Sequence, residues 1–118
     1  QLQPEGEELL RSLATPLAGY LAAREQILMV SGFTDDRPVR ASNGQFADNW
    51  ELSAQRALTV TRSLIDAGVP ADAVFAAAFG PQQPVASNDD ASGRAKNRRV
   101  EIAPMPRPAR SPAAADGR

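Results

Sequence analysis

The segment from Asp48 to Ala67 constrains the fold more than any other part of the chain. Asp48 followed by Glu51 is typical of a capped helix start, with aspartate in place of the usual serine or threonine. Gly68 stands where such a helix commonly ends, and Pro70 prevents its continuation. A stripe of small and apolar residues at helical spacing joins these signals: Ser53, Ala57, Val60, Thr61, Leu64 and Ile65. We therefore expect a long helix with one face against a core.

A second long helix is predicted upstream, over residues 5–24. Its inner face is expected to consist of leucines at spacings of three and four, namely Leu10, Leu13, Leu17 and Leu21. Pro16 lies inside this pattern, where a proline removes one backbone hydrogen bond and costs ~3 kcal/mol. The sequence therefore allows either one kinked helix or two shorter ones.

Three short apolar runs are predicted as strands because they are too short for helices. They cover residues 27–30, ended by Ser31 and Gly32, residues 74–79, closed by Gly80, and residues 99–102. The order is helix, strand, helix, strand and strand, with a short helix before the last strand as an option. This order predicts an α/β fold, an α+β sandwich with two long helices on one face of a small sheet.

The length of 118 residues indicates one folded domain, which we place at residues 1–103. Residues 104–118 are rich in proline, alanine and arginine and have few large apolar groups, so we expect a disordered tail. Because the sequence begins with Gln1, we expect it to be part of a longer protein, with an anchor or signal upstream.

The residue inventory argues against an enzyme. The chain has no histidine and no cysteine, which removes the usual general base, thiolate nucleophiles and the commonest metal ligands. The Asp35-Asp36 and Asp89-Asp90 pairs do not have the spacing of a calcium loop. We therefore predict no catalytic residue, no metal and no cofactor. No run approaches the ~18 apolar residues of a membrane span.

One flank of the helix from Asp48 carries a candidate ligand site. Asn49, Leu52 and Arg56 follow at i, i+3 and i+7, so they share this flank, which begins at the helix N-terminus, where anions are favoured. The planar guanidinium of Arg56 can bind a carboxylate through two bonds. The alternative is that Arg56 is a solvated arginine paired with a nearby acid.

Asp35 follows a predicted strand, at the edge where open α/β sheets place their ligands. If Arg56 faces it, the pair suits a zwitterion, with an ammonium at Asp35 and a carboxylate at Arg56. The alternative is that Asp35 only caps its own turn through an Asx-type bond.

A basic cluster surrounds the last predicted strand and comprises Arg94, Lys96, Arg98 and Arg99. Arg98 stands at the strand entrance, from where it can reach a cleft at the rim, whereas Arg99 is expected to pair with an acid or face solvent. Nucleic-acid binding is the usual alternative for such a cluster. A net charge of -1 and the lack of interleaved aromatic residues argue against it, so no nucleic acid is predicted as a partner.

Three motifs together resemble the OmpA-like peptidoglycan-binding domain. They are Gly32-x-Thr34-Asp35, Asn49-x-x-Leu52-Ser53-x-x-Arg56-Ala57 and Gly93-Arg94-Ala95-x-Asn97-Arg98-Arg99-Val100-Glu101, and the resemblance covers about residues 5–103. The Asn-Trp-Glu-Leu-Ser form and the long loop before it look most like the MotB stator subunits of the flagellar motor.

This resemblance implies an OmpA-like mixed sheet and non-covalent binding of the meso-diaminopimelate in the peptidoglycan stem peptide. It implies that Asp35 and Arg56 hold the charged ends of that residue, and that Thr34, Asn49, Leu52 and Arg98 line the same pocket. It further implies a homodimer in the periplasm of a Gram-negative bacterium, part of a protein anchored in the inner membrane.

One residue departs from the family pattern, because Phe33 stands where the family usually has histidine. Three alternatives to a wall-anchored stator stay open. They are an outer-membrane tether of the Pal or OmpA type, an OmpA-like interaction domain that has lost wall binding, and a hydrolase acting on the wall. The residue inventory disfavours the last.

Overall fold

The computed structural model describes residues 4–39 and 46–108. Its elements follow in the order α1 (Pro4–Arg24), β1 (Gln26–Phe33), α2 (Asn49–Ala67), the short 3-10 helix η2 (Ala71–Ala73), β2 (Val74–Gly80), α3 (Ala91–Asn97) and β3 (Val100–Pro106). The three strands form one sheet in the order β2-β1-β3, with β1 parallel to β2 and antiparallel to β3. The predicted mixed sheet is therefore confirmed.

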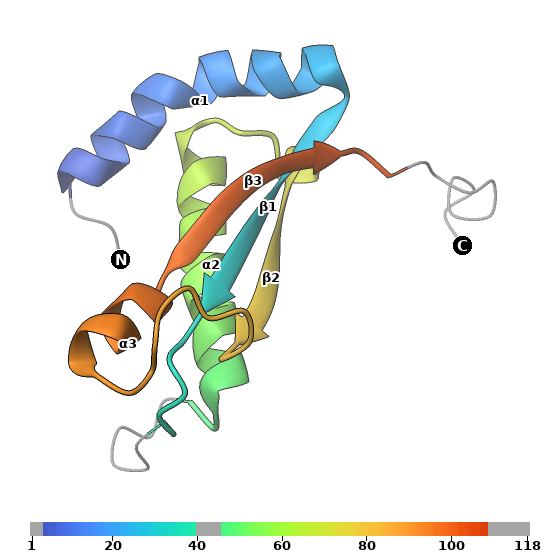
Figure 1. Ribbon diagram of the computed structural model, residues 1–118. Helices are drawn as coiled ribbons and strands as arrows, with labels where there is room; N and C mark the ends of the chain where they lie inside the picture. Colours follow the sequence, from blue (N-terminus) through green and yellow to red (C-terminus); the bar gives the residue numbers. More distant parts are fainter. Residues whose placement is uncertain (1–3, 40–45, 109–118) are drawn as a thin grey trace.

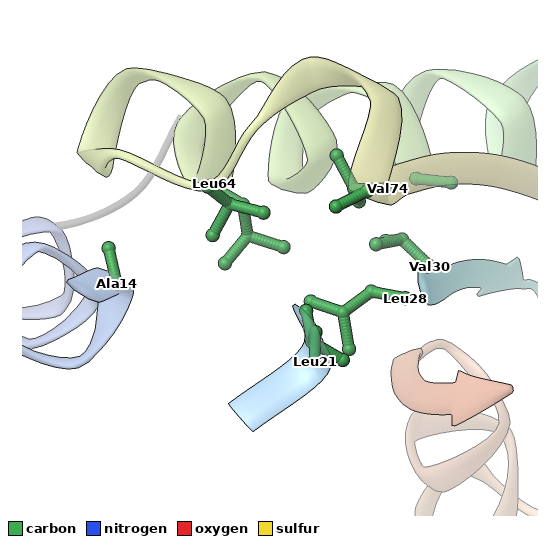
Figure 2. Close-up of a cluster of buried hydrophobic side chains, with 9 residues drawn as sticks. Ala14, Leu21, Leu28, Val30, Leu64 and Val74 are labelled. Atoms are coloured by element: carbon green, nitrogen blue, oxygen red, sulfur yellow. The ribbon is translucent and has the colours of Figure 1, made fainter. Parts of the chain in front are cut away.

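The core lies between the sheet and the two long helices. Strand register puts Leu28 and Val30 of β1 beside Val74 and Ala76 of β2 on the same face. Ala14 and Leu21 of α1 and Leu64 of α2 belong to the same buried cluster (Figure 2). Both long helices thus cover one face of the sheet, as expected.

Both ends of α2 form as the sequence predicts. The side chain of Asp48 accepts a hydrogen bond from the backbone N–H of Glu51 at 2.9 Å, and Glu51 in turn accepts one from the N–H of Ala47 at 3.0 Å. Gly68 ends the helix with a backbone φ of 126°, a conformation that residues with a Cβ rarely adopt. The predicted inner stripe of α2 is buried or half-buried.

The helix α1 is one continuous helix with Pro16 in its interior. It changes direction partway along its length (Figure 1), as expected where a proline removes a backbone hydrogen bond. The predicted inner face is partly wrong, because Leu13 is 50% exposed and Ala14 is buried in its place. Leu17 is half-buried and Leu21 buried, as predicted, while the side chain of Leu10 lies outside the described part.

Strand β1 is longer than predicted, because Ser31 and Gly32 continue it to Phe33. Gly32 is needed there for a packing reason. A Cβ at this position would lie 2.0 Å from the backbone oxygen of Ser53, so the missing side chain lets α2 approach β1 closely. The glycine therefore marks a close approach rather than a strand end.

Strand β3 corrects the boundary predicted at residue 103, because it begins at Val100 and runs to Pro106. Two backbone bonds flank it, from Phe33 N–H to the Arg99 oxygen and from Arg107 N–H to the Glu25 oxygen. The backbone N–H and C=O groups of the odd-numbered residues of β3 therefore point toward β1. The backbone nitrogens of Pro104 and Pro106 point away from β1, as an edge strand allows. The rest of the predicted tail, residues 109–118, lies outside the described residues.

Candidate functional site

The candidate site lies at one end of the molecule. Figure 1 shows the carboxyl ends of β1 and β2, the start of α2 and the helix α3 gathered there. Open α/β sheets commonly bind ligands beyond the carboxyl ends of their strands. The topology therefore brings the three motifs of the sequence to the same place.

Asp35 is buried just after β1 and has partners on two sides. One carboxylate oxygen accepts the backbone N–H of Arg37 at 3.0 Å, and the other accepts Nη1 of Arg98 at 2.8 Å. The first bond is the Asx-type turn considered from the sequence. The second is an ion pair between residues 63 positions apart, with the Asp35 side chain 11% exposed and that of Arg98 42% exposed. Asp35 thus caps its turn and also presents a carboxylate at the rim.

Thr34 and Asn49 support the turn that carries Asp35. The hydroxyl of buried Thr34 donates to the backbone oxygen of Asp35 at 2.7 Å, and its N–H donates to the oxygen of Gly80 at 2.8 Å. The amide nitrogen of Asn49 donates to the backbone oxygens of Asp35 at 3.4 Å and Arg37 at 2.9 Å. Their polar groups hold the backbone of residues 34–37 against the start of α2.

Arg56 reaches the same place from α2. Its Nη1 donates to the backbone oxygen of Phe33 at 3.3 Å. Burial, and then the nearby charge of Arg98, lower the pKa of Arg56 from its usual value, while Asp35 opposes this shift. Arg56 and Leu52 also line a shallow cleft of about 260 Å³ between α2 and Val100. The charges of Asp35, Arg56 and Arg98 therefore act on one another and form one charged group. Contrary to the expectation of a single pocket, however, Arg56 and Leu52 line a different cleft from Asp35 and Arg98.

Arg98 and Arg99 point to different partners, as the sequence predicts. Arg98 follows α3 and reaches Asp35, whereas Arg99 forms an ion pair with Glu101 at 2.6 Å. The guanidinium of Arg99 also lies 3.8 Å from the centre of the Phe33 ring. Phe33 is buried and stacks on Phe79 with ring centres 4.8 Å apart. The ring of Phe33 thus packs on the side of the sheet that carries Arg99 and Glu101, and its backbone oxygen meets Arg56.

Asn97 has a role that the sequence reasoning missed. Its fully buried side chain accepts the N–H groups of Val85 and Ala86 at 2.8 and 3.1 Å and donates to Ala86 and Asn88 at 2.9 and 2.8 Å. These bonds tie the turn-rich segment before α3 to the helix. Asn97 stands inside the third motif, beside Arg98, so its place in that motif was the available signal.

Sequence reasoning also missed Arg37, and it left Arg94 without a role in the site. Both line a cleft of about 580 Å³ with Asp35, Pro38, Val39 and Arg98. The signal for Arg37 was its position two residues after Asp35, in the polar segment that follows β1. Residues 40–45 of that segment lie outside the described residues.

Two findings concern the described ranges only. No group of three or more acidic side chains there is arranged to hold a metal ion. None of the helices there has the length and apolar character needed to cross a membrane.

The chain is similar to known proteins in sequence and in fold. The model of the OmpA family matches residues 1–98. Motility protein B of Bacillus subtilis is 43% identical over 108 residues, covering 86% of this chain and 41% of that protein. Peptidoglycan-binding protein ArfA of Mycobacterium bovis is 39% identical over 101 residues, covering 86% of this chain and 28% of that protein. The chain thus spans less than half the length of these relatives.

The fold is also that of a solved structure. The C-terminal domain of Helicobacter pylori MotB superposes with a TM-score of 0.75 at 28% sequence identity. The match covers 98% of this chain and 83% of that one.

Proposed function

Because the chain belongs to the OmpA family, we propose that it is a peptidoglycan-binding domain that anchors a MotB-like stator protein to the cell wall. The likeness to Motility protein B and to the MotB C-terminal domain supports the stator part of this proposal. The name of the relative ArfA supports the wall ligand. The domain then works in the periplasm, and the membrane anchor belongs to another part of the protein.

The observation that carries the proposal is the meeting of one carboxylate and two guanidinium groups at the carboxyl end of β1. Asp35 contacts Arg98 directly, and the charges of Asp35 and Arg98 both act on Arg56. Such a group suits an amino-acid-like end that carries an ammonium and a carboxylate. The free end of meso-diaminopimelate in the stem peptide has this chemistry, so we take it as the ligand.

Binding then involves an exchange of partners. The ammonium of the ligand replaces Arg98 at Asp35, and its carboxylate binds Arg56. Arg98 loses its ion pair with Asp35 in this exchange. The carboxylate of the ligand then offsets part of the positive charge of Arg98. The turn of residues 34–37 need not move, since Thr34 and Asn49 hold its backbone.

The function proposed here is binding without turnover. An anchor needs no chemical step, and several weak contacts in one assembly add up to strong attachment. The sequence supports this, since it contains neither histidine nor cysteine. A turnover assay on purified peptidoglycan tests it, and release of soluble fragments would contradict it.

Two rival functions use the same fold. A Pal- or OmpA-type tether would bind the same ligand from the outer membrane, and the kind of membrane attachment of the whole protein decides between it and a stator. The second rival, an interaction domain without wall binding, is raised by Phe33 in place of histidine. The packing of Phe33 on Phe79 and beneath Arg99 weakens this second rival, because it gives the ring a structural role outside the charged group.

We also propose that the domain acts as a homodimer, as the family resemblance implies. Leu9 and Leu13 leave apolar surface exposed on α1, at 59% and 50%. A second copy that covers these side chains would remove that surface from water.

The binding proposal is tested by replacing Asp35 with asparagine. Asp35→Asn keeps an oxygen for the N–H of Arg37 but removes the charge that binds the ammonium. We expect binding to purified peptidoglycan to fall by about tenfold or more in co-sedimentation. The free energy of unfolding should change by no more than about 1 kcal/mol, because the lost ion pair is partly exposed.

The matched control is Asp36→Asn, which removes the same charge from the exposed neighbouring side chain. Arg56→Gln should behave like Asp35→Asn, with Arg62→Gln on the exposed side of α2 as its control. Free diaminopimelate should compete with the wall for the unmodified protein. Equal binding by the Asp35→Asn and Asp36→Asn variants would contradict the proposal.

A further inference from the structure

The cleft beside Asp35 carries more positive charge than a zwitterion can balance. The cleft has a volume of about 580 Å³ and lies between the segment after β1 and the helix α3. The charged residues that line it are Asp35, Arg37, Arg94 and Arg98. Three arginines thus face one aspartate. Arginine side chains stay protonated at neutral pH, so this lining has an excess of two positive charges.

Among the described residues, no ion pair beyond the one at Asp35 offsets this excess. Within residues 4–39 and 46–108, the only ion pair in the cleft joins Arg98 to Asp35. Arg94 donates from Nη1 to the backbone oxygen of Asn88 at 2.9 Å, which is an uncharged partner. The side chain of Arg37 contacts no carboxylate of these residues at ion-pair distance.

A ligand with one ammonium and one carboxylate leaves this excess unchanged. The same holds when the ligand ammonium replaces Arg98 at Asp35. The excess positive charge of the cleft falls only if the ligand brings further negative charge into it. Each arginine offers a planar set of donors that matches a carboxylate, so a second carboxylate is the group that the lining suits.

We propose that Arg37 and Arg94 form an anion subsite that binds a second carboxylate of the stem peptide, next to the group that binds its zwitterionic end. This inference rests on the proposed wall-binding function and specifies its ligand. The domain then distinguishes stem peptides by their charge: it binds those with free carboxylates and discriminates against those in which these groups are amides.

The second carboxylate has two sources in a stem peptide that ends at diaminopimelate. One is the α-carboxylate of the glutamyl residue, which is free because that residue is linked through its γ-carboxyl group. The other is the carboxylate of diaminopimelate at the peptide end, away from the free amino group. Both offer the same chemistry, so two amidated peptides tell them apart.

Arg37→Gln is the variant of choice, because the known contacts of Arg37 are made by its backbone. Its N–H donates to Asp35 and its oxygen accepts from Asn49, and glutamine keeps both. Arg94→Gln is less suitable, since it would break the bond to Asn88. Arg62→Gln is the matched control, with the same change in net charge on an exposed arginine outside the cleft.

The experiment is calorimetric titration with the peptide L-alanyl-γ-D-glutamyl-meso-diaminopimelate and with its two monoamides, which keep the zwitterionic end intact. For the parent peptide, we expect Arg37→Gln to weaken binding about fivefold and Arg62→Gln to leave it nearly unchanged. One monoamide should bind the unmodified protein about fivefold more weakly. The Arg37→Gln variant should bind that monoamide no more weakly than the unmodified protein does. Which of the two monoamides binds more weakly shows which carboxylate occupies the subsite.

Two outcomes overturn the inference in distinguishable ways. If the parent peptide and both monoamides bind the unmodified protein equally, or if Arg37→Gln and Arg62→Gln behave alike, the subsite is wrong while wall binding stands. If the parent peptide does not bind, the proposed function fails and the subsite fails with it.

Discussion

At the scale of single residues, Gly32 shows how one missing side chain sets the distance between two elements. It lies in β1, directly under α2, and the oxygen of Ser53 occupies the space that a Cβ would need. The hydroxyl of buried Ser53 accepts the N–H of Gly80 at 2.9 Å, so the same residue also joins α2 to the end of β2. The charged group of the site depends on this close packing, because α2 carries Arg56 and β1 leads to Asp35.

We predict that Gly32→Ala destabilises the domain by about 2–3 kcal/mol or more. The new methyl group would meet backbone atoms of α2, which cannot rotate away as a side chain can. The free energy of unfolding in urea measures this change. Peptidoglycan binding should also weaken, because α2 has to shift.

Gly19→Ala is the control for this substitution. Gly19 lies in α1 and a Cβ there would meet nothing within 4 Å. Alanine should therefore stabilise the helix, by about 0.5–1 kcal/mol. Equal effects of the two substitutions would show that the approach of α2 to β1 does not depend on Gly32.

At the scale of elements, β3 shows how an edge strand tolerates prolines. Its pairing with β1 continues through Pro104 and Pro106, which pair with Leu28 and Gln26. Alternate residues of an antiparallel edge strand point their N–H groups to solvent, so prolines at those positions cost no ladder bond. Composition alone suggested a disordered tail there, because proline counts do not reveal which side of the strand each one faces.

We predict that the position of an added proline decides its effect on β3. Ala103→Pro removes an N–H that faces β1 and should destabilise the domain by about 1–3 kcal/mol. Ile102→Pro is the control, because it continues the existing alternation of prolines and leaves the ladder bonds in place. Urea unfolding of the two variants measures the difference. A smaller loss for Ala103→Pro than for Ile102→Pro would contradict the assigned register.

At the scale of the whole molecule, α1 exposes apolar side chains within the described part of the chain. Ala14 and Leu21 bury one side of this helix, while Leu9 and Leu13 lie on exposed surface. The charged site lies at the carboxyl ends of β1 and β2, and α1 lies toward the opposite end of the sheet (Figure 1). A second copy bound along α1 would therefore leave both sites free to bind the wall.

We predict that the protein sediments as a dimer and that Leu9→Glu combined with Leu13→Glu makes it a monomer. Two charges on this surface would oppose the burial that a dimer requires. Sedimentation velocity measures the change, with circular dichroism to confirm the fold. Ala22→Glu, which adds charge at another exposed position of α1, is the control. A monomeric unmodified protein at high concentration would contradict the dimer.

The sequence by itself determined the elements with local signals and the residues of the charged group. Capping residues, helical spacing and glycine stops act within a few positions, which is why the bounds of α2 were predicted closely. The motifs around Asp35, Arg56 and Arg98 named the three charges that meet in the structure. Their role in binding the wall stays a prediction.

Only the tertiary structure decided which residues approach one another across the chain. Asp35 and Arg98 meet because β1 and β3 are antiparallel neighbours, a pairing that no local pattern encodes. The same pairing carries β3 through its prolines and continues β1 through Gly32, where the close approach of α2 leaves no room for a side chain. The place of Arg37 and Arg94 in one cleft, and of Asn97 under the preceding turn, likewise depends on contacts between segments that only folding brings together.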